Sequence, residues 1–379
     1  MSSTPPAADP SQSADGVRQG EARRTRRLRR PGAVGVSSFL LYALVFAAAL
    51  IPVPYLLQMP GPVVNTLEPY EGRELITISG TQTYEAEGQL DMLTVAVAGG
   101  PGRSVYASNA LGSLVKGSET VVPSEAFYPL ETTREQVSDQ NSADMVSSQD
   151  EATAAALGEL GIDFSTVVGV SSVAPDSAAA GAVEPGDLLL KVDGTPVEGS
   201  PEGMAAVKDA VASSDGPVAL TVQRDGEEHE VEVEPHDVDG TRAIGVVMGL
   251  GYSFPFDVEF AVEGIGGPSA GTIFALTIID KLTEGNLTGG VPIAGTGAID
   301  AEGVISPIGG ARQKVVAAEA AGAEYFLSPA DNCAEVLSAP GAEDLTVVRV
   351  DDLHEARAAV EDIAADEDGA LPSCAPAHS

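Results

Sequence analysis

The chain has 379 residues, enough for two or three compact domains, and its formal net charge is −36. Arginines gather at the start, where residues 1–36 hold seven of them against three acids, and everything after is strongly acidic. Nucleic acid is therefore excluded as a partner of the main body, because phosphate binding needs a basic surface. Two cysteines, Cys333 and Cys374, exclude a disulfide framework and leave open either one bridge or two free thiols. The four scattered histidines lack metal-ligand spacing, so we expect neither a metal nor another cofactor.

The N-terminal region predicts a membrane anchor. Residues 1–36 have the composition of a disordered tail. Residues 37–57 carry no charge, and about 20 apolar residues are what a transmembrane helix requires. A cleaved signal peptide is the alternative, which we consider weaker because the apolar run is long and lacks a clear cleavage site. The arginines should remain cytoplasmic, so we expect a single-pass cell-membrane protein with residues 58–379 outside the cytoplasm.

The next block, residues 58–160, is expected to form the N-terminal part of an extracytoplasmic protease domain. Residues 73–100 contain two alternating, strand-like runs, each followed by a glycine turn. The polar residues 116–142 are expected to form a loop. Residues 145–160 carry a helical Ala/Leu pattern that ends at Gly161.

Residues 161–236 form a separable block of strands around one helix, which opens at Ser200-Pro201. The run AAAGAVEPGDLLLKVDG, which ends at Gly194, resembles a PDZ domain of the HtrA type. The resemblance implies that peptide termini bind at Val168, Gly169 and Val170 and that an extended peptide adds to the sheet edge there. The alternative is a PDZ domain that packs internally and binds no free ligand.

Residues 237–360 contain a candidate nucleophile. Ser269 follows Gly267-Pro268 and stands at the first turn of an apolar helix. Such a serine is more often a helix cap than a nucleophile. A nucleophile there gains a free backbone N–H and a helix dipole that stabilise the oxyanion formed on attack. Pro268 has no N–H, so a second donor must come from a nearby glycine or another loop, and Gly267 is counted as a supporting residue.

Lys314 is the candidate base, because no histidine lies in any pattern near Ser269. The chain has only five lysines, and this one follows Gly309-Gly310 and precedes an apolar run. A lysine acts as a base only if burial lowers its pKa from about 10.4 toward neutrality. A surface position is the default for an isolated lysine at a helix start.

Three motifs in order, GGPSAG, AGTG and SPIGGARQK, resemble the proteolytic domain of Lon-type proteases. The resemblance implies an α+β fold of the ribosomal protein S5 domain 2-like kind, with Ser269 as nucleophile, Lys314 as base and Thr296 orienting the lysine. Many Lon-type proteases carry an acidic residue at the position of Gly267. The sequence therefore does not predict whether the site inhibits itself before substrate binds. The chain contains no P-loop motif, which predicts proteolysis independent of ATP.

Residues 237–360 are too few for the whole Lon-type fold, so we expect the PDZ domain to be inserted into the protease domain. The arrangement resembles the bacterial membrane-anchored PDZ-containing Lon-like proteases. It implies polypeptide substrates, recognised through exposed C-termini, and a homo-oligomer such as a hexamer. Residues 361–379 are expected to form an acidic tail. The alternatives are an inert PDZ scaffold at the membrane and, more weakly, a phosphate cradle at GGPSAG.

Overall fold

The computed structural model describes residues 33–70, 72–129, 131–224, 226–238, 240–262, 264–366 and 371–374. Most of the predicted N-terminal tail, residues 1–32, lies outside this part of the chain. The chain divides into two units, Met1–Leu50 and Ile51–Ser379, and each is considered by itself.

The first unit contains helix α1, Ala33–Ala49, which carries no acidic or basic residue. Its large apolar side chains are exposed, among them Phe39 and Phe46 at 72% and 68%. The helix ends eight residues before the predicted limit at Leu57, and Tyr55 already begins a strand, so the prediction of one helix over 37–57 is wrong in its second half. Among the helices of the described chain, none combines the length and apolar character needed to cross a bilayer.

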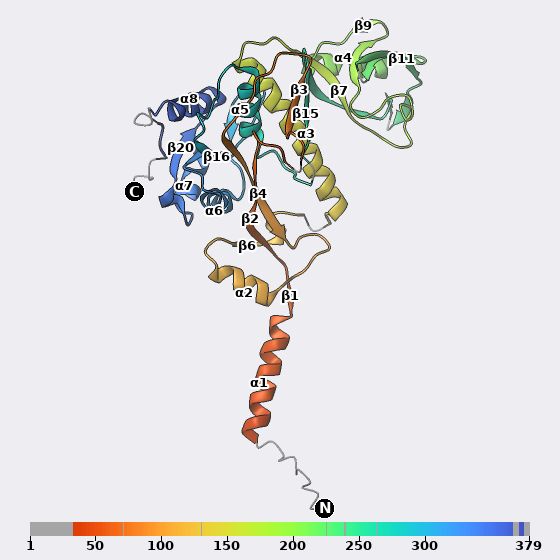
Figure 1. Cartoon of the computed structure of the whole chain (residues 1–379). Helices are drawn as coiled ribbons and strands as arrows, with labels where there is room; N and C mark the ends of the chain where they lie inside the picture. Colours follow the sequence, from red (N-terminus) through yellow and green to blue (C-terminus); the bar gives the residue numbers. More distant parts are fainter. Residues whose placement is uncertain are drawn as a thin grey trace, which may run out of the picture. The chain divides into compact units, whose positions relative to one another are not determined.

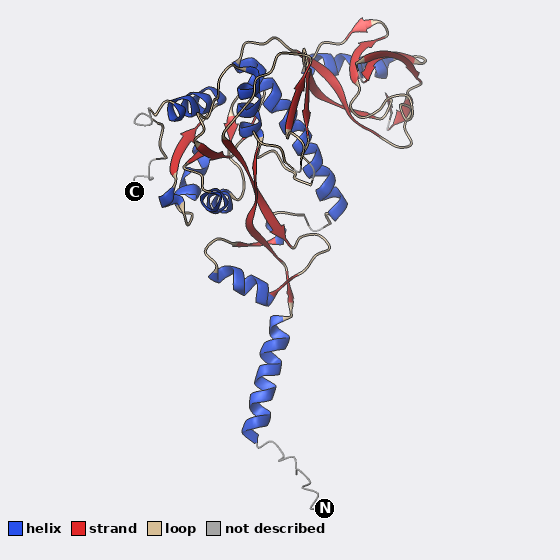
Figure 2. Cartoon of the chain, in the orientation of Figure 1, coloured by secondary structure: helices blue, strands red, loops and turns tan. Residues whose placement is uncertain are grey.

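The second unit is built on a six-stranded sheet in the order β20-β19-β16-β4-β2-β6 (Figures 1 and 2). Strands β16, β19 and β20 run parallel to one another and to β4, whereas β2 is antiparallel to both β4 and β6. The strands are β2 Tyr55–Asn65, β4 Gln89–Ala98, β6 Thr120–Pro123, β16 Pro292–Gly295, β19 Tyr325–Pro329 and β20 Thr346–Val350. Half of the strands precede the block at 161–236 and half follow it, so that block is inserted into the chain of this domain.

Helices cover both faces of this sheet, because its strand residues alternate between two cores. Ile293 of β16 packs in the core formed with α3, α5 and α8, whereas the next residue, Ala294, packs in the core formed with α6. Met92 and Leu93 of β4 divide in the same way. The helices are α3 Arg134–Glu159, α5 Gly271–Leu282, α6 Ala311–Ala321, α7 Cys333–Leu337 and α8 Leu353–Ala364.

Helix α3 begins 11 residues before the start predicted at 145, and β6 occupies part of the predicted loop. The missed start has a clear cap, since Thr133 accepts a hydrogen bond from the Gln136 amide while Gln136 Oε1 accepts one from the Thr133 amide. The first three turns are polar and largely exposed, so they lack the apolar period that signals a helix.

The inserted block forms a second sheet in the order β11-β10-β8-β7-β14, with β9 paired to β8 (Figure 1). Helix α4, Pro201–Ser213, begins where predicted, with Ser200 as its N-cap. The sheet reaches Ser253, beyond the predicted boundary at 236, because β14 pairs with β7 along its whole length. The strands are β7 Ser165–Val173, β8 Leu188–Val192, β9 Thr195–Pro196, β10 Val218–Arg224, β11 Glu227–Val233 and β14 Val246–Ser253.

Short strands complete the unit. Strand β15 pairs with β3 beside the main sheet, β17 pairs with β18, and β12 pairs with β13. Strand β1 pairs with β5, which leads directly into helix α2. Their bounds are β1 Pro52–Val53, β3 Ile76–Ser79, β5 Val105–Tyr106, α2 Ala107–Val115, β12 His236–Val238, β13 Thr241–Ala243, β15 Asp257–Phe260, β17 Ala298–Ile299 and β18 Ile305–Ser306.

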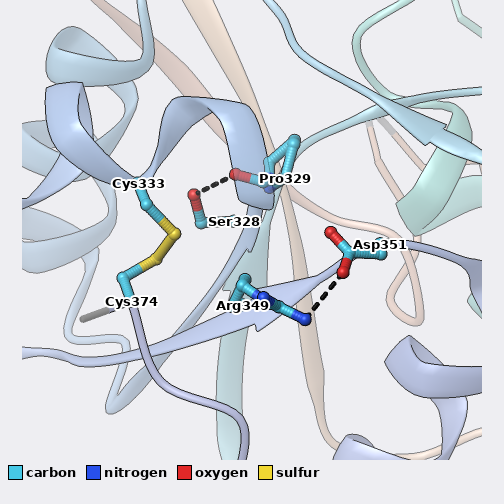
Figure 3. The surroundings of a disulfide bond; sticks show 6 residues. All are labelled: Ser328, Pro329, Cys333, Arg349, Asp351 and Cys374. Atoms are coloured by element: carbon cyan, nitrogen blue, oxygen red, sulfur yellow. Dashed lines mark hydrogen bonds and ion pairs between the residues drawn. A yellow bond between two sulfur atoms is a disulfide. The ribbon is translucent and has the colours of Figure 1, made fainter. Parts of the chain in front are cut away.

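The C-terminal segment is attached to the main sheet by a disulfide. Cys333, at the start of α7, is bonded to Cys374 (Figure 3). Ser373 forms a β-bridge with Val348 of β20. The two alternatives left open for the cysteines are thereby resolved in favour of one bridge. Helix α8 extends to Ala364, so the predicted tail starting at 361 begins four residues too early.

Candidate active site

Ser269 lies in a tight turn immediately before α5 (Gly271–Leu282), and not in the first helical turn as predicted. The Gly271 amide donates to Pro268 O at 3.3 Å, which closes the turn. Helix α3 holds the same loop from the side, because Ser148 Oγ donates to Pro268 O at 3.0 Å. The half-exposed serine hydroxyl is therefore presented on a loop that two helices fix in place.

Lys314 reaches Ser269 from the opposite face of the sheet, on helix α6. Its Nζ lies 2.7 Å from Ser269 Oγ and 2.8 Å from Thr296 Oγ1. The residue is only 1% exposed, and burial lowers its pKa to about 7. A buried ammonium loses hydration that two hydroxyl groups only partly replace, so the neutral amine is populated near neutrality.

Thr296 follows β16 directly and joins the two residues. Its hydroxyl donates to Ser269 O at 2.9 Å and accepts from Lys314 Nζ. The next amide, of Gly297, also donates to Ser269 O, at 3.1 Å. The end of β16 thus fixes the backbone of the serine and orients the amine of the lysine.

Ser269 and Lys314 open into a pocket of about 320 Å³. Apolar side chains dominate its wall, including Met92, Val95 and Met145, and among the described residues that line it only Lys314 is ionisable. The second half of β4, residues 93–98, runs along one side of the pocket. Strand β16 pairs only with Gln89–Met92 of β4 and therefore does not cover this half. Within the described chain, that half of β4 has no strand partner on the pocket side.

Gly267 contributes through its backbone. Its φ of +89° is a left-handed conformation that favours glycine. Its amide donates to Asn141 O at 3.1 Å, so it is already bonded and cannot serve as an oxyanion donor in this arrangement. The amides of Ser269 and Ala270 donate no hydrogen bond to any described residue.

Sequence reasoning missed the contribution of α3 to this site. Ser148 and Asn141 lie about 120 residues before the nucleophile, in a region expected to be partly loop, and carry no motif. The helical pattern at 145–160 was the one available signal, and it does not say what the helix packs against.

The predicted peptide site at Val168, Gly169 and Val170 needs correction. Strand β7 is central, because Val168 and Gly169 pair with β14 on one side and with β8 on the other. The Val170 amide donates to Asp187 O, and Val168 is fully buried. A peptide strand cannot add where both edges of a strand are occupied. The terminal strands of this sheet in the described chain are β11 and β14, and each leaves one edge without a strand partner.

The described residues contain no group of three or more His, Cys, Asp or Glu side chains arranged to hold a metal ion. At the site itself, Ser269 supplies a hydroxyl and Lys314 a buried amine.

Comparisons with known proteins agree with this geometry. Residues 261–360 match the family described as Lon protease (S16) C-terminal proteolytic domain, and residues 169–224 match the PDZ domain family. Ser269, Thr296 and Lys314 all lie within the first match. The chain thus carries a Lon-type proteolytic region and a PDZ domain.

One relative is a Lon protease from Phenylobacterium zucineum (strain HLK1), which is 38% identical over 74 residues. That match covers 20% of this chain and 9% of the relative. Among solved structures, the PDZ domain of the SdrC-like protein from Listeria innocua is 27% identical, covering 22% of this chain and 92% of that one with a TM-score of 0.20. The corresponding Listeria monocytogenes domain is 24% identical, covering 22% and 86%, with a TM-score of 0.19.

Proposed function

We propose that this protein is a membrane-anchored, ATP-independent serine endopeptidase that uses Ser269 as nucleophile and Lys314 as base. The contact of 2.7 Å between Lys314 Nζ and Ser269 Oγ in a buried setting carries the proposal. The match of residues 261–360 to a proteolytic domain supports it independently.

The reaction follows from the positions of these groups. Neutral Lys314 takes the hydroxyl proton as Ser269 Oγ attacks the scissile carbonyl carbon. The amides of Ser269 and Ala270, which donate to no described residue, are proposed as the donors to the oxyanion. The Lys314 ammonium then protonates the departing amine, which leaves an acyl-enzyme. Lys314 next removes a proton from water, whose oxygen attacks the ester carbonyl; as the bond to Ser269 Oγ breaks, Lys314 returns this proton to Oγ and the new carboxyl terminus of the substrate leaves.

The substrate is proposed to lie in an extended conformation against residues 93–98 of β4. That edge borders the pocket and is not covered by β16, so its backbone groups can pair with a peptide. The apolar wall formed by Met92, Val95 and Met145 then receives a side chain next to the scissile bond, which favours an aliphatic residue there.

The PDZ domain is proposed to recognise exposed C-termini or extended segments of the substrate. We place this contact at β14, Val246–Ser253, which is one of the two terminal strands of its sheet. This strand continues through β15 into the loop that carries Ser269, so a bound segment would be tethered to the same domain as the active site.

Membrane attachment and assembly belong to the same proposal. Helix α1 has no charge and exposes large apolar residues on all sides, which suits a lipid environment. The arginine-rich N-terminus would remain cytoplasmic and the catalytic domain would lie outside, where ATP is scarce. A homo-oligomer, with a hexamer as the specific expectation, is testable by sedimentation in detergent.

The test is cleavage of an unfolded protein by the full chain in liposomes, with and without ATP. Ser269→Ala and Lys314→Ala are expected to lose at least about a thousandfold in kcat/KM. Lys208→Ala, which removes an exposed lysine of α4, is the matched control and should retain full activity. Activity that survives in Lys314→Ala would exclude the dyad. A wild-type chain that binds peptides but cleaves none would favour an inert PDZ scaffold.

A further inference from the structure

Helix α2, Ala107–Val115, is buried on one side and apolar on the other. Ala110 and Ser113 are buried, and Ala110 packs in a small core with Leu57 and Val105. Leu111, Leu114 and Val115 are 64%, 69% and 87% exposed. Their spacing of three and four residues places them on one side of the helix, which we call the α2 outer face.

An outer face of this kind is unusual on a helix that already has a packed side. A surface helix normally carries polar or charged residues opposite its buried face. A contiguous apolar face in water marks a surface that is covered by a protein or by a membrane.

The path of the chain indicates which of these covers it. The Ala107 amide, at the start of α2, donates to Ile51 O at 2.9 Å, and β1 pairs with β5 beside this contact. Ile51 is only two residues beyond the end of α1. Ile51 is the first residue of the second unit, so the start of α2 is bonded to the residue through which this unit is joined to the apolar helix.

The charge distribution favours a lipid surface. Residues 31–67 contain no acid and no base, and residues 92–123 contain one acid, Glu119, against Arg103 and Lys116. The chain as a whole has a net charge of −36, and an acidic protein surface is repelled by anionic lipids. These two stretches are therefore much less acidic than the rest of the chain and can approach a bilayer with less of that repulsion.

Two partly exposed tyrosines accompany the helix. Tyr106 directly precedes it and is 46% exposed, and Tyr55 lies in the adjacent strand β2 at 40%. Tyrosine is enriched at the level of lipid headgroups, where its ring is apolar and its hydroxyl is hydrated. An amphipathic helix that lies in this plane buries its apolar face by about 5–10 Å.

We propose that the α2 outer face lies in the lipid interface and holds the catalytic domain at the membrane surface as a second contact beside α1. The inference rests on the proposed membrane attachment through α1. It extends that proposal, because one uncharged helix alone would let the domain rotate freely above the bilayer.

The absence of tryptophan from the chain permits a direct test. Full-length protein with one introduced tryptophan is reconstituted in vesicles of phosphatidylcholine and phosphatidylglycerol, with or without acyl-chain bromine as a quencher. Leu114→Trp reports on the α2 outer face and Phe46→Trp reports on α1. Val238→Trp, in β12 of the inserted block, is the matched control, because that residue is 55% exposed.

The expected result is loss of emission with brominated lipid for Leu114→Trp and Phe46→Trp, and no loss for Val238→Trp. Quenching of Phe46→Trp alone would overturn the α2 contact and leave the α1 anchor standing. If neither is quenched, both the anchor and the α2 contact fail. The emission of Leu114→Trp could also resist quenching both by aqueous acrylamide and by brominated lipid. That result would overturn the lipid contact and indicate that a second copy of the protein covers the α2 outer face.

Discussion

The pH dependence of proteolysis is the sharpest consequence of the buried lysine. Burial lowers the pKa of Lys314 to about 7, and only the neutral amine can accept the Ser269 proton. The neutral fraction then rises from about a tenth at pH 6 to about nine tenths at pH 8. Proteolysis should therefore increase about tenfold over this interval and stay level above it.

A solvent-exposed lysine predicts a different curve. With a pKa of about 10.4, the neutral fraction would rise about a hundredfold between pH 6 and pH 8 and continue to rise tenfold per pH unit. The two cases separate clearly in kcat/KM measured with a fluorogenic unfolded substrate at constant ionic strength. A hundredfold rise with no plateau below pH 9 would refute the reasoning from burial.

Another titrating group could imitate this profile, and the structure supplies the control. Desolvation raises the pKa of Asp150, on α3, to about 6. Asp150→Asn removes that titration and leaves Lys314 unchanged. We expect the same tenfold rise in this variant. A flattened profile in Asp150→Asn would assign the dependence to the carboxylate.

Three further predictions concern the groups around this site and the inserted domain. Thr296→Val removes the hydroxyl that bonds Lys314 Nζ and Ser269 O, and should lower kcat by about 10- to 100-fold with little change in KM, whereas Thr296→Ser should restore most of the rate. Replacing Cys333 and Cys374 by serine opens a loop of 41 residues and should lower the free energy of unfolding by about 4 kcal/mol, measured by denaturant titration. Arg224 is bonded to the buried carboxylate of Asp187 at 2.7 Å, and Arg224→Met removes this partner. The substitution should destabilise the PDZ domain by about 3–5 kcal/mol. An unchanged melting temperature would contradict the importance of this pair.

The contribution of the Asp187 carboxylate to stability should depend on pH. Desolvation acts to raise the pKa of this carboxyl, but the hydrogen bonds and charge of Arg224 outweigh it, so the pKa is lowered. The carboxylate therefore contributes stability above its unfolded pKa near 3.9, and this contribution is lost as the pH falls through the lowered folded pKa. Arg224→Met should show no such acid-side loss in unfolding experiments.

Patterns within short stretches of the sequence predicted several helices and strands correctly. The alternation in residues 73–100 became β3 and β4, and the cap at Ser200 with apolar Met204, Val207 and Val211 became α4. Such features are encoded by the spacing of apolar side chains and by cap and turn residues, which act over a few positions. The start of α3 was missed because its first turns are solvent-exposed.

The peptide-binding strand could not be located from the same patterns. The resemblance to a PDZ domain predicted a peptide-binding edge at Val168–Val170, but β14, which covers one edge of that strand, comes about 80 residues later. Whether a strand is central or terminal depends on which other strands pair with it, and a periodic pattern in one segment does not contain that information.

Ser269, Thr296 and Lys314 were recognisable in the sequence as residue types at motif spacing, together with the two domain blocks that surround them. Only the tertiary structure brings these residues into contact. Ser269 lies in a loop before a helix on one face of the sheet, and Lys314 lies on a helix on the other face. The end of β16 brings them within 2.7 Å. Burial of the lysine, and hence its lowered pKa, arises from contacts with segments far away in the chain, because desolvation depends on every group that surrounds the amine.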